Sequence, residues 1–291
     1  PLEFMSAKSI KQQHGTVRDM IGGGWLNVLP GEVTDDTQMT LAVAHGIADS
    51  PRGPIEAIGR YFVNWYNSSP KDVGATCASS IRSAICAARQ KRSPTKADWK
   101  RASKVTHNLT AGRTAGKGSL MRTAYVGLYY SDEQEIRQKA YDISRMTHYD
   151  EDTAIDCAAY CAALNEMLET ANFNARIEAI SGCTEREGRY SYDVLSSPFF
   201  QPNPTGYVVD SFAAALHCIY TMSSFEEAEI KAVNLGGDAD TIGAITGGLA
   251  GALYGYDAIP KQWISTLFTD TRNEINELCD VAIKARTEAG A

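Results

Sequence analysis

The predicted architecture depends on one segment, Asn234-Leu-Gly-Gly-Asp-Ala-Asp-Thr-Ile-Gly-Ala-Ile-Thr-Gly-Gly-Leu-Ala-Gly-Ala-Leu-Tyr-Gly255. A glycine pair permits a tight backbone turn, two carboxylates and a hydroxyl follow it, and a helix made almost entirely of small residues comes next. Each glycine inside a helix costs roughly 1 kcal/mol relative to alanine, so this composition indicates a need for close backbone approach. We therefore expect a buried, closely packed helix whose N-terminal end holds a hard cation.

The acidic residues of this segment, Asp238 and Asp240, have three other interpretations. Carboxylates at a helix start can simply cap its exposed N–H groups. An EF-hand loop that begins at Asp238 is excluded, because two of its ligand positions would be Ile242 and Leu249, which have no side-chain oxygen. A phosphatase-type Asp-x-Asp nucleophile would end a buried strand, whereas residues 224–233 have helical spacing and begin with a capping-box pattern.

A second acidic motif, Thr34-Asp-Asp-Thr-Gln-Met39, follows a predicted turn at Pro30-Gly31. Apolar residues recur at helical spacing after it, so Thr34 is a predicted N-cap with Asp35 and Asp36 in the first helical turn. Taken alone, acids there complement the helix dipole. Two helix starts with oxygen-only side chains, however, suit Mg²⁺, Mn²⁺ or Ca²⁺ and not zinc, which prefers histidine or cysteine. Together they offer four carboxylates and two hydroxyls for a two-metal centre that activates water.

The composition is that of an ordinary globular protein, with 291 residues, 44% hydrophobic and 22% charged. The seven cysteines form no Cys-x-x-Cys pair and resemble reduced core thiols, and no apolar run approaches the ~20 residues that span a bilayer. These features predict a cytoplasmic protein with no membrane contact. A net charge of −7 argues against general nucleic-acid binding, because affinity for the phosphate backbone comes from clustered lysine and arginine.

Helical spacing continues through the middle and the end of the chain. Residues 55–66 have it, Asp152 to Leu168 reads as a buried central helix, and a capping-box pattern runs from Ser131 to Gln134. Pro260 is a predicted start for one final helix through Val281. No linker or repeat divides the chain, so we expect a single all-α domain over 1–291. It begins at Pro1-Leu-Glu-Phe-Met without a methionine, and we expect that an N-terminal segment is missing.

Six motifs, taken in order, resemble those of the ADP-ribosylglycohydrolase family over nearly the whole chain. They are Pro1-Leu-Glu-Phe-Met, Gly31-Glu-Val-Thr-Asp-Asp-Thr-Gln-Met, Gly116-Lys-Gly-Ser-Leu-Met-Arg122, Thr147-His148, Pro204-Thr-Gly-Tyr-Val-Val-Asp210 and the segment from Asn234 to Gly255. The resemblance implies a single compact multi-helix domain around a two-metal site that holds Mg²⁺ or Mn²⁺. The two acidic motifs, followed by the glycine-rich helix, are its specific part.

The resemblance also assigns roles to individual residues. It implies metal ligation by Thr34, Asp35, Asp36, Asp238, Asp240 and Thr241, and catalytic roles for Glu3, Asp35, Asp72 and Asp240. From the sequence alone, Glu3 is either a solvent-facing residue or a carboxylate held near the site. The implied substrate-binding residues are Gly116, Lys117, Gly118, Ser119, Met121, Arg122, His148 and Tyr207. Lys117 departs from the family, where asparagine is common at this position.

Residues 110–122 read as a glycine-rich loop that enters a helix, and its N–H groups can bind a pyrophosphate with charge from Lys117, Arg113 or Arg122. The alternative is a flexible connector with solvated bases. His148 taken alone is typical of a helix C-terminal cation, and Tyr207 either stacks on a nucleobase or packs beneath its loop.

The implied activity is hydrolysis of the N-glycosidic bond between ADP-ribose and an arginine of a protein substrate, with ADP-ribose as product. Hydrolysis of O-linked serine or other ADP-ribose conjugates is the first alternative. A different class is an ADP-ribose-binding or immunity protein that occludes a partner toxin. The sequence leaves open the native metal, the modified acceptor, the oligomeric state and the need for the missing N-terminal segment.

Overall fold

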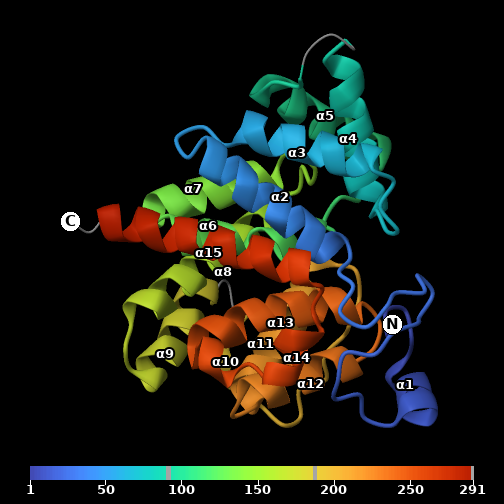
Figure 1. Ribbon diagram of the computed structural model, residues 1–291, viewed down its shortest axis with the longest axis vertical. Coiled ribbons are helices and arrows are strands. Elements are labelled where there is room, and N and C mark those ends of the chain that lie inside the picture. The colour runs from blue at the N-terminus through green and yellow to red at the C-terminus, as the bar shows by residue number, and fades with distance from the viewer. Residues whose placement is uncertain (90–92, 186–188, 290–291) are drawn as a thin grey trace. The chain divides into compact units, whose positions relative to one another are not determined.

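The computed structural model describes residues 1–89, 93–185 and 189–289 as an all-helical protein (Figure 1). Fifteen α-helices and two short 3₁₀ helices cover the described residues, and two isolated β-bridges are the only β-structure among them. The all-α prediction is thereby confirmed. None of the described helices is both long and apolar enough to span a bilayer.

The chain divides into two compact units, and the divisions fall inside α8 (Glu151–Glu169) and α15 (Thr269–Ala289). Unit 1 comprises residues 1–33 and 163–272, and unit 2 comprises residues 34–162 and 273–291. The complete helices of unit 1 are α1 (Ala7–His14), α9 (Phe173–Thr184), α10 (Tyr192–Leu195), α11 (Val208–Thr221), α12 (Phe225–Asn234), α13 (Ala239–Tyr254), η2 (Tyr256–Ala258) and α14 (Lys261–Thr266). Those of unit 2 are α2 (Asp35–Asp49), α3 (Ile55–Asn67), α4 (Ala75–Ala87), α5 (Lys96–Leu109), η1 (Lys117–Arg122), α6 (Ala124–Tyr129) and α7 (Glu133–Ser144).

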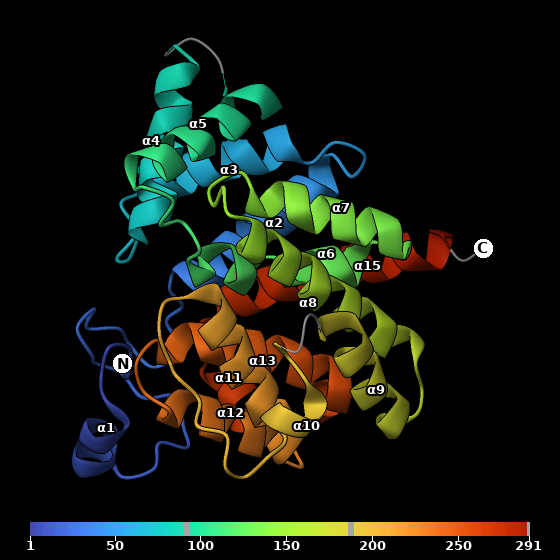
Figure 2. The ribbon, with the colours of Figure 1, turned by 180° about the vertical axis from the view of Figure 1, so that it is seen from behind.

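In unit 2, local capping residues mark where helices begin, and buried side chains pack the helices against one another. In it α3, α4 and α5 lie side by side (Figure 2). Thr95 begins α5 with a reciprocal capping box to Asp98, and Trp99 of that helix is buried against Phe62 of α3. The predicted buried helix is confirmed as α8, whose residues 153–165 are nearly all buried.

Unit 1 is organised around α13, the glycine-rich helix. Helices α11 and α12 pack against it through a core of Ala214, Cys218, Ala232 and Ile242. Because the residues of α13 are small, the Glu229 carboxyl group as well as the neighbouring helix packs closely against it. A Cβ added at Gly247 would lie 2.8 Å from Oε1 of Glu229 in α12, and one at Gly243 would lie 3.5 Å from its Oε2. Close approach is therefore found at Gly243 and Gly247, whereas a Cβ at Gly251 would meet no atom within 4 Å.

Two helix boundaries differ from the sequence predictions. The predicted single helix after Pro260 is wrong, because α14 ends at Thr266 and a new helix begins at Thr269. Gly31 packs on this break, and a Cβ there would lie 1.9 Å from the carbonyl oxygen of Thr266. The predicted cap at Ser131 is also wrong, because Asp132 is the N-cap of α7 and its Oδ1 accepts a hydrogen bond from the Glu135 N–H at 2.7 Å.

Glu229 makes the stability of the fold depend on pH. Its Oε1 is buried without a hydrogen-bond partner among the described residues, and burial raises the pKa of the carboxyl to about 8. The folded state keeps this proton while the unfolded chain loses it above pH ~4.5, so the free energy of unfolding falls between pH ~4.5 and ~8 by at most about 1.4 kcal/mol per pH unit. The loss is complete above the folded-state pKa.

We expect Glu229→Gln to flatten this decline, because the amide stays neutral at every pH. Urea denaturation at pH 5, 6, 7 and 8 measures the slope. Glu226→Gln is the matched control, because Glu226 is exposed on the same helix. Equal slopes for the wild type and Glu229→Gln would contradict the raised pKa.

Candidate active site

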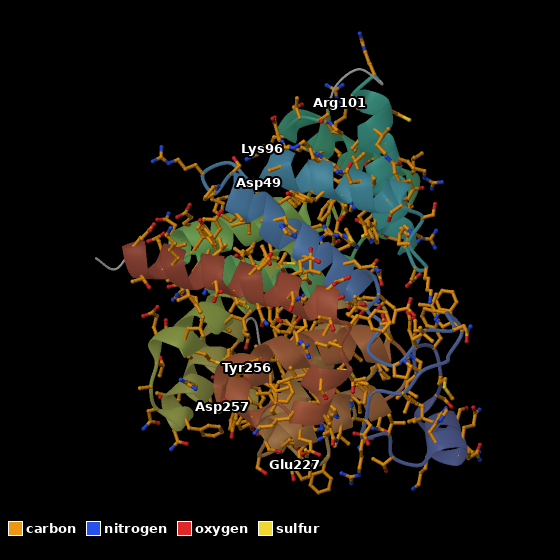
Figure 3. The ribbon with its side chains drawn as sticks, in the orientation of Figure 1. Asp49, Lys96, Arg101, Glu227, Tyr256 and Asp257 are labelled. Carbon is orange, nitrogen blue, oxygen red and sulfur yellow. The ribbon has the colours of Figure 1, made fainter. Side chains whose placement is uncertain are left out.

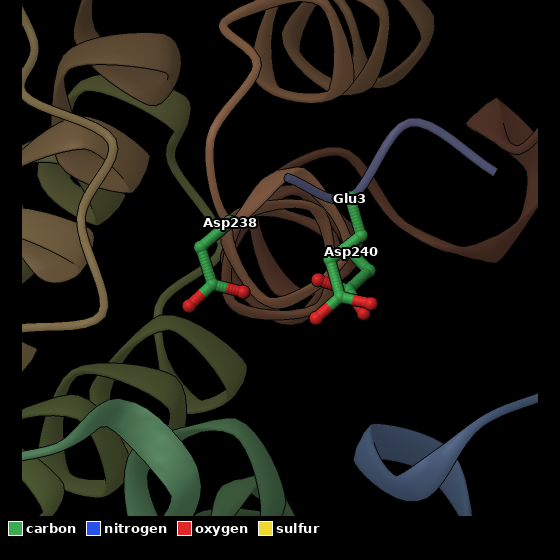
Figure 4. Close-up of side chains that lie close together, drawn as sticks. All are labelled: Glu3, Asp238 and Asp240. Carbon is green, nitrogen blue, oxygen red and sulfur yellow. The ribbon is translucent and has the colours of Figure 1, made fainter. Parts of the chain in front are cut away.

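Three carboxylates meet at the N-terminal end of α13 in unit 1. Each of Glu3, Asp238 and Asp240 offers one oxygen, and the three oxygens lie within 4.8 Å of one another (Figure 4). Glu3 is 6% exposed and Asp238 4% exposed, whereas Asp240 is half-buried. Of the two interpretations of Glu3, the structure supports the carboxylate held near the site.

Backbone hydrogen bonds bring these carboxylates together from opposite ends of the sequence. The Phe4 N–H donates to the Gly237 carbonyl at 2.6 Å, and the Gly237 N–H donates to the Met5 carbonyl at 2.7 Å. An antiparallel bridge between Ser6 and Gly236 continues the pairing. The N-terminal segment is therefore tied to the turn that precedes Asp238, and Glu3 is fixed beside α13.

The glycine pair is required for this pairing. Gly236 and Gly237 have φ values of +74° and +63°, which favour glycine. A Cβ on Gly236 would lie 2.6 Å from the Met5 carbonyl oxygen, and one on Gly237 would lie 2.0 Å from the Pro204 carbonyl oxygen. Two other segments of the chain thus approach the pair too closely for any side chain.

The carboxylates are not explained by helix capping. Asp238 occupies the N-cap position of α13 but makes no side-chain capping hydrogen bond, and its backbone N–H donates to the Pro204 carbonyl at 3.3 Å. Asp240 accepts one hydrogen bond at Oδ1 from the Thr241 N–H at 2.8 Å. The capping interpretation is therefore wrong for Asp238.

The donor set fits a hard divalent cation. Three carboxylates this close repel one another when ionised, and a bound cation with oxygen ligands removes that repulsion. The predicted ligand Thr241 is buried in the first turn of α13. The chemistry of the trio favours Mg²⁺, Mn²⁺ or Ca²⁺ over zinc, as expected from the sequence.

The first acidic motif belongs to unit 2. Thr34 is the N-cap of α2, as predicted, but makes no side-chain capping hydrogen bond, and Asp35 and Asp36 are buried in the first turn. The starts of α2 and α13 thus share a feature. Both place buried acidic residues there, and in neither does the N-cap side chain accept a capping hydrogen bond. A joint two-metal site that includes this motif stays a prediction.

Unit 2 also holds a buried guanidinium. Arg122 is fully buried, and its Nη1 donates to the Gly118 carbonyl at 3.0 Å while Nη2 donates to the Thr147 hydroxyl at 2.7 Å. Its guanidinium carbon lies 4.7 Å from the centre of the Phe62 ring. Carbonyl, hydroxyl and aromatic partners thus hold this cation in place.

His148 lies beside this cation. Its Nδ1 is 2.8 Å from the Thr147 hydroxyl, and Gly118 packs against its ring, where a Cβ would meet Cε1 at 3.2 Å. Burial lowers the pKa of His148 well below 6.5, and the charges of Arg122 and Lys117 lower it further. His148 is therefore a neutral imidazole and not the helix C-terminal cation considered from the sequence.

The neutral state of His148 predicts its titration. We expect its imidazole resonances, assigned with His148→Gln, to stay in the neutral form between pH ~6 and ~8. Because the unfolded histidine gains a proton below about pH 6.5 and the folded one does not, the free energy of unfolding falls as the pH is lowered through that value. A protonated signal at pH 7 would contradict this assignment.

The glycine-rich loop enters a helix as predicted, and this helix is η1, a 3₁₀ helix. The Ser119 side chain faces the interior, where its hydroxyl lies 2.9 Å from the Ser144 hydroxyl, and the Met121 side chain is also buried. Gly116, Lys117 and Gly118 are half-buried. Only backbone groups of Ser119 and Met121 therefore remain suited to a ligand, and the pyrophosphate role stays a prediction.

Two further predicted residues lie on loops. Asp72 is half-buried in the segment before α4, and Tyr207 is 40% exposed at the N-cap of α11. Their roles toward ribose and adenine stay predictions. The sequence reasoning did not assign a role to Trp25, whose indole N–H donates to Oε2 of Glu3 at 2.8 Å. The only signal for it was the glycine run at residues 22–24.

Fold and site together define an all-α protein with an oxygen-rich site at a helix start. More specifically, the chain belongs to the ADP-ribosylglycohydrolase family, whose model matches residues 1–291. It is 32% identical to the ADP-ribosyl-(dinitrogen reductase) glycohydrolase of Rhodospirillum rubrum, over 97% of this chain and 89% of the relative. It is 30% identical to the ADP-ribosylarginine hydrolase Tri1 of Serratia proteamaculans, over 88% of this chain and 69% of the relative.

A solved structure agrees with this membership. A chain described as an ADP-ribosylglycohydrolase-related protein complex matches with a TM-score of 0.77 and 28% identity, over 98% of this chain and 91% of that one. The family resemblance drawn from the six motifs is confirmed, and the protein is an enzyme of the glycohydrolase class.

Proposed function

We propose that the protein hydrolyses the N-glycosidic bond between ADP-ribose and an arginine side chain of a modified protein. The observation that carries the proposal is the trio of Glu3, Asp238 and Asp240, which gathers buried negative charge at one point. The names of the relatives from Rhodospirillum and Serratia support the substrate class.

The reaction exchanges one bond at the anomeric carbon of ribose. A water oxygen forms a bond to that carbon while the bond to the guanidino nitrogen breaks. The water gives up a proton to a carboxylate, and the departing guanidino nitrogen takes up that proton, so that the arginine is released as guanidinium. Positive charge develops at the anomeric carbon, so anionic surroundings favour the transition state. The trio of unit 1 meets that demand, and the family resemblance implies catalytic roles for Asp35 and Asp72 as well.

Two divalent cations, Mg²⁺ or Mn²⁺, complete the proposal. In unit 1 the ligands would be Asp238, Asp240, Thr241 and Glu3. The family resemblance implies Thr34, Asp35 and Asp36 as further ligands. When bound, such ions lower the pKa of a coordinated water and orient ribose hydroxyls. The chain's own residues do the rest: Asp240 or Glu3 accepts the proton of water, and the backbone of 116–119 with Lys117 binds the pyrophosphate.

The test compares two linkages on one peptide sequence. ADP-ribose release is measured from a peptide modified on arginine and from one modified on serine, with Mg²⁺ present. We expect faster release from the arginine peptide. Release from the serine peptide alone would replace the proposed linkage with the O-linked one. Binding of ADP-ribose without release from either peptide would replace hydrolysis with a binding or toxin-occluding role.

A further inference from the structure

A short hairpin of unit 1 carries the side chain that contacts Glu3. Gly23 and Val28 exchange two backbone hydrogen bonds, of 2.7 and 3.1 Å, and the Asn27 N–H donates to the Gly24 carbonyl at 3.1 Å. Gly24 has φ +73°, and a Cβ there would lie 2.6 Å from the Cα of Pro1. The hairpin is thus packed on the start of the N-terminal segment, with Trp25 at its turn.

Trp25 faces the site with one edge and solvent with the rest of its ring. Its Nε1 donates to Oε2 of Glu3, yet the residue is 56% exposed. Phe4 lies beside it, with ring centroids 5.7 Å apart and planes inclined by 37°. Phe4 has φ +62°, an uncommon value for a bulky residue, and is 68% exposed although its N–H is bound to Gly237.

Simple packing does not account for these two aromatic side chains. Exposed aromatic surface lowers stability relative to burial, and a strained backbone at Phe4 adds to that cost. Both features occur next to the carboxylate trio. Sites that keep exposed aromatic faces beside negative charge suit a flat organic cation, which the ring quadrupoles and the carboxylates attract together.

We propose that Phe4 and Trp25 form the subsite for the guanidinium of the acceptor arginine, and that the Trp25 N–H positions the Glu3 carboxylate. This inference rests on the proposed arginine linkage and adds the residues that select it. A guanidinium matches the subsite in charge and planarity, because it stacks on aromatic faces and keeps its N–H donors for carboxylates. A serine acceptor offers neither property, so the subsite discriminates between the two linkages.

The kinetic test separates the two roles. Phe4→Leu removes one face, and we expect the KM for the arginine peptide to rise about 3- to 30-fold with kcat nearly unchanged. Trp25→Leu removes a face and the N–H, so KM rises and kcat falls. Trp25→Phe keeps a face and therefore restores KM toward the wild-type value, while kcat stays low because Glu3 has lost its donor.

The control variant is Tyr256→Leu. Tyr256 is another exposed aromatic of unit 1 at the opposite end of α13 (Figure 3), about 24 Å from Asp238 by the rise of a sixteen-residue helix. We expect it to change neither constant. The inhibition constant of free ADP-ribose, which has no acceptor, is expected to stay the same in all four variants.

Three outcomes would overturn the inference. The first is a KM in Phe4→Leu and Trp25→Leu equal to that of Tyr256→Leu. The second is a loss of ADP-ribose inhibition in parallel with the rise in KM, which would mean general damage to the site. The third concerns agmatine, a guanidinium probe followed by tryptophan fluorescence in the presence of ADP-ribose: equal binding by the wild type and Phe4→Leu contradicts the subsite.

The agmatine measurement also distinguishes this inference from the proposed function. If the wild type releases no ADP-ribose but binds agmatine more tightly than Phe4→Leu, hydrolysis fails and the subsite stands. If the wild type hydrolyses the arginine peptide and agmatine binds both proteins equally, the function stands and the subsite fails.

Discussion

Replacement of both Asp238 and Asp240 by asparagine is expected to lower the turnover number by at least about 1,000-fold, because catalysis loses the carboxylates that gather charge at the reacting carbon. Initial rates of ADP-ribose release at saturating substrate measure this loss of turnover. Asp257→Asn is the matched control, because Asp257 is an exposed acid just beyond the other end of α13 (Figure 3). Turnover within tenfold of the wild type in the double variant would contradict the role of the trio.

The same variant separates catalysis from folding. Asparagine keeps the size of the side chains and removes mutual repulsion, so we expect the double variant without metal to melt at or above the wild-type temperature. Mn²⁺ is expected to raise the melting temperature of the wild type, since a ligand that binds only the folded state stabilises it, and to leave the variant unchanged. Under the toxin-occlusion alternative the double variant would still protect against its partner.

Gly237→Ala is expected to lower both the stability and the activity of the protein strongly. Its Cβ would lie 2.0 Å from the Pro204 carbonyl oxygen, and φ is +63°, so both sterics and backbone conformation oppose the change. We expect a loss of stability on the order of 3 kcal/mol. Activity is expected to fall at least about 100-fold, because the turn that places Asp238 must shift. Urea denaturation and initial rates measure the two effects.

Gly251→Ala is the control for this prediction. Gly251 lies within α13, and a Cβ there meets no atom within 4 Å. We expect the substitution to be neutral or to stabilise by up to about 1 kcal/mol, because alanine is the better helix former. Similar losses in both variants would show that α13 rejects side chains generally and that the turn is not special.

Local signals predicted several helices because their determinants lie within a few residues, whereas α1, α4, α5, α9, α10 and α11 were not predicted individually. Thr34, Ser224 and the alanine-rich stretch of α8 all behave as expected. The shift from Ser131 to Asp132 at the start of α7 shows the limit of such signals. Ser131 to Gln134 and Asp132 to Glu135 are overlapping patterns one residue apart, and only the hydrogen bond to Glu135 decides between them.

The break between α14 and α15 could not be predicted from the residues around it. No glycine or proline lies between Lys261 and Ala289, and at the break a distant residue, Gly31, packs on the Thr266 carbonyl. The sequence around the break therefore continues a helical pattern that the chain does not follow. Tertiary contact overrides propensity here.

The residues of the candidate site also divide into those that a sequence pattern predicted and those that depend on tertiary contacts. The acids of the trio were predicted because two carboxylates beside a glycine pair form a local motif, and Glu3 was predicted by family resemblance. Trp25 was not predicted, because its contact with Glu3 depends on a hairpin in which Gly24 packs closely on Pro1. Glu229 was missed as well, because its high pKa arises from packing against Gly243 and Gly247.

The most direct test of the account is metal-dependent release of free ADP-ribose from an arginine-ADP-ribosylated protein. The enzyme is stripped with EDTA, dialysed, and assayed without metal, with Mg²⁺ and with Mn²⁺. We predict no release without metal and full recovery with at least one of the two ions. Equal release by the stripped enzyme and the metal-loaded enzyme would contradict the central claim that the carboxylate trio works by holding divalent cations.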